Sequence, residues 1–88
     1  DLYIPSAYTP NGDGINDEWQ LRNIENYPNC IIKIWTRENV LVFESLGYKE
    51  MWEGIYKGKN LPADRYQYEI DVHGDAKDVR IGNVTIFR

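Results

Sequence analysis

The chain has 88 residues, with 14 acidic and 10 basic side chains and a net charge of −4. A chain this short is expected to form one domain, residues 1–88, with a thin core and no room for a large enclosed active site. The acidic balance argues against nucleic-acid binding and against an electrostatic membrane anchor, both of which need clustered Lys and Arg. No apolar run approaches the ~20 residues that a membrane-spanning helix requires.

The first half of the chain shows strand signals and no helical periodicity. Leu2–Ile4 and Glu18–Leu21 are weak strand candidates. The Ile32–Ile34 run alternates apolar and polar residues, and Val40–Glu44 follows after a short turn, so the two are predicted to form a hairpin. Asn39 in that turn tolerates a left-handed backbone better than any residue except glycine.

The second half contains the clearest strand. Residues 47–62 are punctuated by glycine and read as irregular, with Trp52 as an anchor. Arg65–His73 alternates apolar and polar residues without a break, as expected of a strand with one face on a core and the other in water. Val79–Phe87 reads as a final strand with a bulge or bend at Gly82–Asn83. Six or seven short strands with regular turn signals predict an all-β fold, a small Ig-like antiparallel β-sandwich.

The sharpest local feature is the oxygen-rich loop of residues 10–17. Calcium prefers several oxygen ligands at close range, which flexible loops of Asp, Asn and backbone carbonyls supply. Asn11, Asp13 and Asp17, with the carbonyl of Ile15, are therefore candidate calcium ligands. The spacing does not fit an EF-hand, because Arg22 stands where a bidentate Glu is required. The alternative is a turn whose side chains cap backbone N–H groups.

Aromatic residues offer a second functional hypothesis. An exposed row of Trp52, Tyr66 and Tyr68 could stack on sugar rings, as in a carbohydrate-binding module. The alternative is that Trp52 closes one end of a thin sandwich while the tyrosines line its core. The strict alternation of Tyr66 and Tyr68 with polar residues favours this core role.

No grouping of residues points to catalysis. Cys30, the only cysteine, lies in an apolar run and reads as a buried thiol. His73 lies on the polar face of its strand, and Ser6 and Ser45 have no neighbouring base. We therefore expect a protein that is not an enzyme.

The order of the motifs resembles a known family. Ile4–Asp17, which contains Pro-Asn-Gly-Asp-Gly-Ile-Asn-Asp, is similar to the opening of the gliding motility-associated C-terminal domain. Ile24–Asn29, Trp52–Gly54, Gly58–Lys59 and Tyr66–Tyr68 follow in the order typical of that family. The resemblance covers the chain from about Tyr3 to Arg88.

The resemblance implies a small Ig-like sandwich at the C-terminus of a larger secreted protein. Such domains are type B sorting signals for the type IX secretion system, which exports folded cargo across the outer membrane. The implied function is non-catalytic export and cell-surface attachment, by way of the periplasm. The implied partners are outer-membrane components of that machinery, and the isolated domain is expected to be monomeric. Asp1–Pro5 does not resemble a signal peptide, so a precursor would carry that signal upstream. The alternative function is a calcium-dependent adhesive or carbohydrate-binding β-sandwich.

Two segments are the candidate recognition surface for a partner, and two others depart from the family pattern. The candidate surface comprises the loop Asn11–Asp17 and the C-terminal strand Asn83–Arg88. Arg37–Asn39 replaces the Arg-Trp-Gly that is usual in the hairpin turn, and Ala63–Asp64 replaces an Asp-Gly. Asp64 would tolerate a left-handed backbone at some cost. The candidate partner-binding residues are Asn11, Gly12, Asp13, Gly14, Asn83, Val84, Ile86 and Arg88.

Overall fold

The computed structural model describes residues 1–14 and 16–88 of the chain. Within these residues the fold is all-β apart from one short 3₁₀ helix, η1 (Ile24–Asn26). The all-β prediction with about seven strands is confirmed. The strands are β1 (Ala7–Tyr8), β2 (Ile31–Trp35), β3 (Leu41–Leu46), β4 (Ile55–Tyr56), β5 (Lys59–Asn60), β6 (Arg65–Asp71) and β7 (Val79–Ile86).

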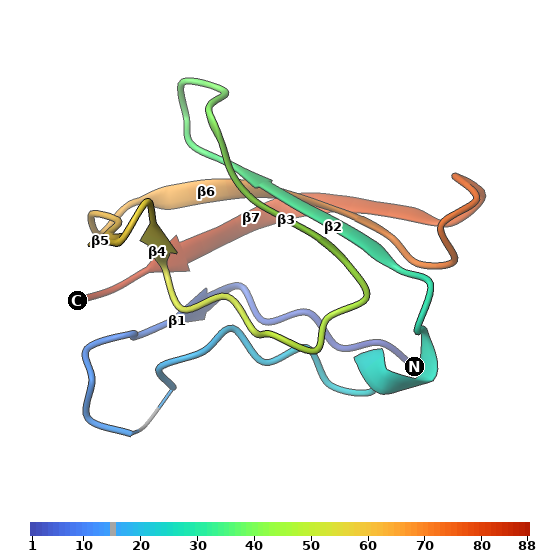
Figure 1. Ribbon diagram of the computed structural model, residues 1–88, viewed down its shortest axis with the longest axis horizontal. Helices are drawn as coiled ribbons and strands as arrows, with labels where there is room; N and C mark the ends of the chain where they lie inside the picture. The colour runs from blue at the N-terminus through green and yellow to red at the C-terminus, as the bar shows by residue number, and fades with distance from the viewer. Residues whose placement is uncertain (15) are drawn as a thin grey trace.

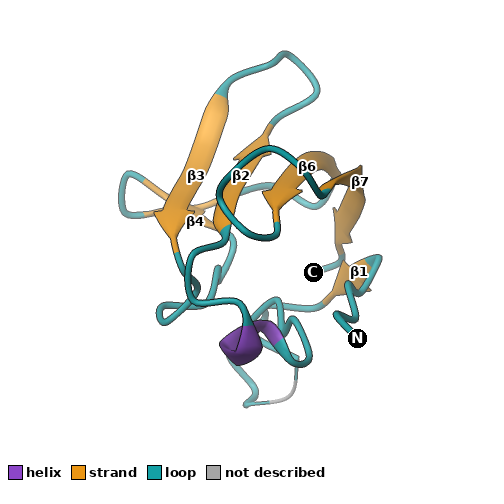
Figure 2. Cartoon of the chain, turned by 90° about the vertical axis from the view of Figure 1, so that its right-hand side faces the viewer, coloured by secondary structure: helices purple, strands orange, loops and turns teal. Residues whose placement is uncertain are grey.

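Five of the strands form one sheet in the order β1-β7-β6-β2-β3, and β4 and β5 form a separate hairpin. The pairs β2–β3, β2–β6 and β6–β7 are antiparallel, whereas β1 runs parallel to β7. Figure 2 shows the five strands following one another along an arc, with loops closing the open side. The segments before β2 and after β3 lie across one face of the sheet in Figure 1. The result is a small β-sandwich whose second layer is mostly irregular chain.

The core lies between the concave face of the sheet and these segments. On β6 the alternation is as predicted, because Tyr66 and Ile70 are buried while Gln67 is exposed. Ile32 and Ile34 of β2 are fully buried beside them. Burial of such side chains stabilises each by about 1.5–3 kcal/mol relative to exposure, which ties the strand pattern directly to the stability of the sheet.

Aromatic side chains and their polar atoms hold the irregular second layer. Trp19 is fully buried, and its ring lies edge-on to the rings of Tyr48 and Trp52, with centroids 6.4 and 6.2 Å away. The Tyr48 hydroxyl donates to the carbonyl of Trp19 at 2.7 Å and accepts from the backbone N–H of Trp52 at 2.8 Å. The backbone N–H of Trp19 donates to the carbonyl of Trp52 at 2.9 Å. These bonds satisfy buried backbone groups that a regular strand would have paired in a ladder.

The weak strand predictions at the N-terminal end are wrong. Neither Leu2–Ile4 nor Glu18–Leu21 is a strand. Tyr3 forms an isolated bridge with Arg22, the residue that follows the second segment. The backbone near Trp19 bonds to Trp52 in the second layer, so local β propensity is overridden there by packing. Residues 47–62, predicted to be irregular, contain the short β4–β5 hairpin.

The bulge predicted at Gly82–Asn83 is also wrong. β7 pairs with β6 from Val79 to Thr85 without a shift in register. Glycine is needed at position 82 because a Cβ there would lie 2.5 Å from the hydroxyl of Tyr68, which covers the backbone. The irregularity in the sheet lies instead between Ile34 and Trp35, where the β2–β3 register shifts.

The two departures from the family pattern differ in their geometry. Asn39 has a φ of 67°, which confirms the predicted left-handed turn. Asp64 does not adopt a positive φ, and its carboxylate accepts a hydrogen bond from the backbone N–H of Arg65 at 2.7 Å. The same Asp64 oxygen lies 2.9 Å from Nε of Arg37, so an ion pair joins the hairpin turn to the start of β6.

Candidate functional site

The oxygen-rich loop is organised around the carboxylate of Asp17. One carboxylate oxygen accepts hydrogen bonds from the backbone N–H groups of Asn11 at 3.1 Å and Gly12 at 2.9 Å. The other accepts from the N–H of Gly14 at 2.7 Å. Both glycines have a φ near +80°, a left-handed conformation that turns their N–H groups toward the carboxylate. These bonds stabilise the charged carboxylate and lower the pKa of Asp17.

This arrangement favours the turn in which side chains cap backbone groups. Asn11 takes part as well, since its Oδ1 accepts from the N–H of Asp13 at 3.2 Å. Ile15, whose carbonyl was the fourth candidate calcium ligand, lies outside the described residues. No cluster of three or more acidic, His or Cys side chains suited to a metal ion occurs in residues 1–14 and 16–88. The calcium hypothesis stays a prediction, and the Asp17 oxygens already have backbone donors.

The Arg88 side chain, just after β7, donates hydrogen bonds to three separate segments of the chain. Its Nη1 donates to the carbonyl of Pro10 at 2.6 Å, and its Nε donates to the carbonyl of Leu61 at 2.6 Å. Its Nη2 donates to the carbonyl of Gly54 at 3.0 Å. Gly54 is required beside it, because a Cβ there would lie 3.1 Å from both Arg88 Nη2 and the Tyr8 hydroxyl.

The loop and Arg88 border one polar pocket of about 480 Å³. Figure 1 shows the loop, the β4–β5 hairpin and the C-terminal residue at the same end of the molecule. Two acidic residues, Asp17 and Glu53, and the basic residue Arg88 line this pocket, so residues of both charge signs border it. The structure thus brings together two parts of the predicted recognition surface that are far apart in the sequence. The lining residues are Pro10, Asn11, Gly12, Asp17, Glu53, Ile55, Asn60 and Arg88.

The last strand does not present all the residues that were predicted to contact a partner. Val84 and Ile86 are buried, with 0% and 1% of their surface exposed, because they lie on the core face of β7. Their side chains are therefore core residues, and their assignment as contact residues is wrong. Asn83 is exposed and pairs with Gln67 on β6.

The aromatic row is not available to stack on a sugar. Trp52 is 1% exposed, and its ring packs against Tyr8 and Tyr66 with both centroid distances at 5.6 Å. Tyr66 is also buried, and its hydroxyl donates to the carbonyl of Pro62 at 2.7 Å. The core role favoured from the alternation is therefore confirmed for these two residues.

The other singled-out side chains lie outside the pocket. Cys30 is fully buried, as predicted, and burial raises the pKa of its thiol. A buried thiol with a raised pKa has little of the reactive thiolate form. His73 is exposed, as predicted, with its ring 5.7 Å from that of Tyr27.

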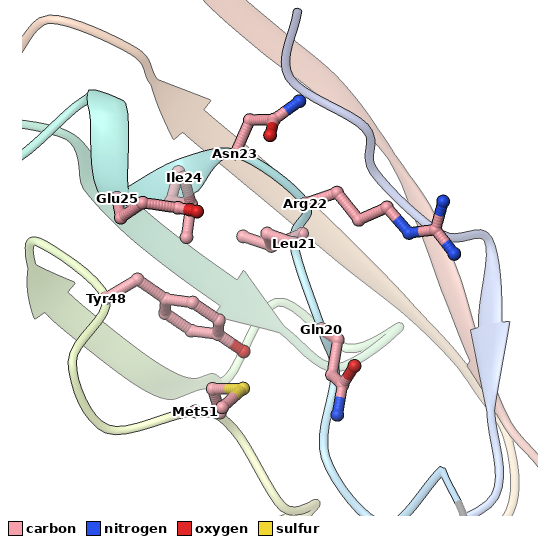
Figure 3. A pocket seen from close by; sticks show the side chains of 8 residues that line it. All are labelled: Gln20, Leu21, Arg22, Asn23, Ile24, Glu25, Tyr48 and Met51. Atoms are coloured by element: carbon pink, nitrogen blue, oxygen red, sulfur yellow. The ribbon is translucent and has the colours of Figure 1, made fainter.

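A second pocket, of about 400 Å³, lies between η1 and the chain after β3 (Figure 3). Leu21, Ile24, Tyr48 and Met51 give it an apolar centre. Arg22 extends away from that centre in Figure 3, and its guanidinium lies 5.7 Å from the centroid of the Tyr3 ring. The sequence did not predict this pocket. It forms where residues 20–25 meet Tyr48 and Met51, and these segments are brought together by tertiary packing.

Several residues that build the polar pocket were also missed. Glu53 and Asn60 were not among the predicted site residues. Arg88 was, but its contact with Pro10, across 78 positions of sequence, was not predicted. Only the Trp-Glu-Gly run at residues 52–54 could have pointed to this region, since it contains both Glu53 and the glycine that accommodates Arg88.

A known structure has a similar fold over nearly the whole chain. A solved structure of PorZ has a TM-score of 0.61 and 14% sequence identity over 99% of this chain, which spans 11% of that protein. PorZ is described as an essential bacterial surface component of the type IX secretion system of Porphyromonas gingivalis. At 14% identity this likeness establishes a shared fold. No curated protein sequence matches the chain significantly. No helix in residues 1–14 and 16–88 is long and apolar enough to cross a membrane.

The family assignment comes from a sequence model rather than from the fold. The model of the CHU_C type IX secretion signal domain matches residues 2–86. That match spans the Asp17-centred loop, the Trp52 region and nearly all of β7. The chain therefore belongs to the CHU_C family of type IX secretion signal domains and acts as a sorting signal for export by that system.

Proposed function

We propose that the sorting signal is recognised as a folded surface, formed where the loop of residues 10–17 meets Arg88. The observation that carries this proposal is the 2.6 Å hydrogen bond from Arg88 Nη1 to the carbonyl of Pro10. Because this bond joins segments that are 78 positions apart in the sequence, the loop and the C-terminal segment form a continuous surface when the domain is folded and not when it is unfolded. Recognition of that surface would select chains whose signal domain is folded.

The described part of the loop, residues 10–14 and 16–17, is suited to recognition because hydrogen bonds hold its backbone before a partner binds. Asp17 satisfies three backbone donors, so the loop loses little conformational freedom on binding. Asn11 and Gly12 at its tip are exposed. Asp17, Glu53 and Arg88 offer both charge signs within one pocket, and such a pattern favours specificity through polar complementarity.

The partners in this proposal are outer-membrane components of the type IX machinery. The domain, residues 1–88, would act as one unit and reach the cell surface by way of the periplasm, attached to a larger protein. Its role would be non-catalytic, and the isolated domain would be monomeric. The family assignment supports this proposal.

A fusion experiment tests whether this surface is recognised. Residues 1–88 are attached to an inert reporter with an upstream Sec signal, in a host that has the type IX machinery. We expect reporter at the cell surface with the wild-type domain and reporter held in the periplasm with Glu53→Lys. Glu50→Lys is the matched control, because Glu50 is exposed, carries the same charge and lies outside the pocket.

Two results bear on the proposal in different ways. Periplasmic retention of the wild-type fusion would count against residues 1–88 as a sufficient signal. Export unaffected by Glu53→Lys and by Arg88→Ala, with both variants folded in urea titrations, would contradict the recognised surface while leaving the signal function intact.

A further inference from the structure

The outer edge of β7 is only partly covered by β1. The backbone N–H groups of Thr85 and Phe87 donate to Ser6 and Tyr8 at 2.9 and 3.0 Å, while that of Ile86 donates to Asp64 beside β6. Backbone groups of successive residues in a strand point to opposite edges. The N–H and C=O groups of Val79, Ile81 and Asn83 therefore face the same edge as those of Thr85, before β1 begins.

Specific residues explain why β1 does not extend along this edge. Pro5 has no backbone N–H to donate, and its carbonyl accepts a hydrogen bond from Nε1 of Trp19 at 2.9 Å. The chain therefore leaves β7 before Ser6 and crosses toward the second layer. Within residues 1–14 and 16–88, no strand pairs with the free side of β7 between Val79 and Asn83.

This edge lacks the features that usually protect an exposed strand. Proteins block free edges with bulges, prolines or charged side chains. The opposite edge of the sheet, β3, has a register shift next to it, whereas β7 pairs with β6 without one. The edge-facing positions of β7 carry Val79, Ile81 and Asn83, and Ile81 is 76% exposed. Arg80 lies between them, but its backbone faces β6 and its charge is paired with Asp78 at 3.1 Å.

The unpaired groups define what can cover this edge. A row of free N–H and C=O groups is satisfied by another extended strand. Five residues span about 17 Å. A strand paired along this length alone would bury far less surface than the roughly 1,000 Å² typical of a specific complex. A second copy is disfavoured, because each chain carries a net charge of −4 and the contact is short. The occupant is instead a strand within a larger docking partner.

The neighbouring charges specify the chemistry of that strand. Ile81 lies opposite Glu69 on β6, and Val79 lies opposite Asp71. The backbone of an added strand would lie about 10 Å from that of β6, two strand spacings away. Long basic side chains that reach across β7 would bring their charges closer to these carboxylates than the Debye length of about 8 Å. Two basic residues lie nearby, and each pairs with another carboxylate. Lys33, opposite Glu69 on β2, lies 4.0 Å from Glu44. Arg80 of β7 donates two hydrogen bonds to Asp78 at 3.1 and 3.2 Å. Basic side chains on the incoming strand are therefore favoured, with an apolar side chain beside Ile81.

We propose that the free edge of β7, Val79–Asn83, binds an extended basic and apolar strand of the export machinery by strand addition. This inference rests on the proposed function for the identity of the partner, and on the unpaired edge for the mode of binding. The partner would then contact the domain in two places, at the polar pocket near the end of β7 and along the backbone of Val79–Asn83.

A peptide titration tests the binding mode without the export machinery. The isotope-labelled domain is titrated with the peptide Lys-Val-Lys-Ile-Lys-Val-Lys, and backbone amide shifts are followed by NMR. We expect shifts confined to Val79–Asn83 and its β6 neighbours. Ile81→Pro removes one edge-facing N–H without touching the β6 ladder, and we expect about tenfold weaker binding from the lost hydrogen bond and the changed strand edge.

Matched controls make the titration decisive. The same peptide with N-methyl groups on alternate residues cannot form the strand bonds, and we expect it not to bind. Leu46→Lys on β3 is the control for Ile81→Lys, because the two side chains are 79% and 76% exposed on opposite edges of the sheet. Shifts that map elsewhere, or equal binding of the N-methylated peptide, would overturn the inference.

The fusion assay then tests the partner. We expect Ile81→Pro and Ile81→Lys to reduce reporter export while Leu46→Lys leaves it unchanged, with urea titrations confirming that all variants fold. Normal export of folded Ile81→Pro would overturn the assignment to the machinery. Wild-type dimers in sedimentation that are lost in Ile81→Pro would identify a second copy as the occupant and overturn the partner strand.

Discussion

Arg88→Ala removes the three hydrogen bonds that hold the loop, the β4–β5 region and the end of β7 together. An intramolecular hydrogen bond contributes about 1 kcal/mol net, so the three together contribute about 3 kcal/mol. Ordering the long Arg88 side chain on folding costs about 1 kcal/mol of rotamer entropy, and this cost is absent in the alanine variant. Because the residue is partly exposed and water can solvate the freed carbonyls, we expect a net loss of about 2 kcal/mol.

Urea and thermal unfolding of residues 1–88 measure this loss. For a domain of this size, 2 kcal/mol lowers the Tm by about 8–16 °C. Arg80→Ala is the control, because Arg80 pairs with Asp78 two residues away, at 3.1 Å, and a surface pair of this kind contributes about 0–1 kcal/mol. A loss below about 0.5 kcal/mol for Arg88→Ala would refute the reasoning.

The remaining predictions concern the sheet, the loop and the core. Gly82→Ala forces a Cβ to within 2.5 Å of the Tyr68 hydroxyl, so we expect about 1–3 kcal/mol of destabilisation in urea; a second substitution, Tyr68→Ala, should remove this steric penalty, and failure to do so would contradict the contact. The lowered pKa of Asp17 means that its contribution to stability is complete above the unfolded pKa of about 3.9 and is lost as pH falls through the folded pKa. Asp17→Asn should therefore weaken the acid dependence of the urea midpoint below about pH 4, and an unchanged acid limb would contradict this role. Trp52→Ala should lower the free energy of unfolding by about 3–5 kcal/mol. On a glycan array, the folded wild-type domain should show no binding that Trp52→Ala abolishes. If the loop is only a capped turn, millimolar calcium should leave the Tm unchanged relative to EDTA, whereas a rise in Tm would support the calcium hypothesis.

The local pattern of the sequence determined the strands of the sheet. The alternation of residues 65–73 and the hairpin around Asn39 depend on the period of a strand and on the backbone preference of one residue. Both are local properties, and the structure reproduces them with Tyr66 and Ile70 buried and Asn39 at a φ of 67°. The ordered motifs likewise indicated the family, because they lie at fixed positions along the chain.

Only the tertiary structure decided which parts of the chain form the site. Arg88 reaches Pro10 across 78 positions, and no local signal encodes a contact of that separation. Val84 is a second example, because valine occurs on both faces of strands. Its pairing with the buried Tyr66 on β6 is what places its side chain on the core face. The open edge of β7 depends on Pro5, whose carbonyl is drawn to Trp19 by packing. Propensity and period act over a few residues, whereas pockets, buried faces and free edges depend on which distant segments meet.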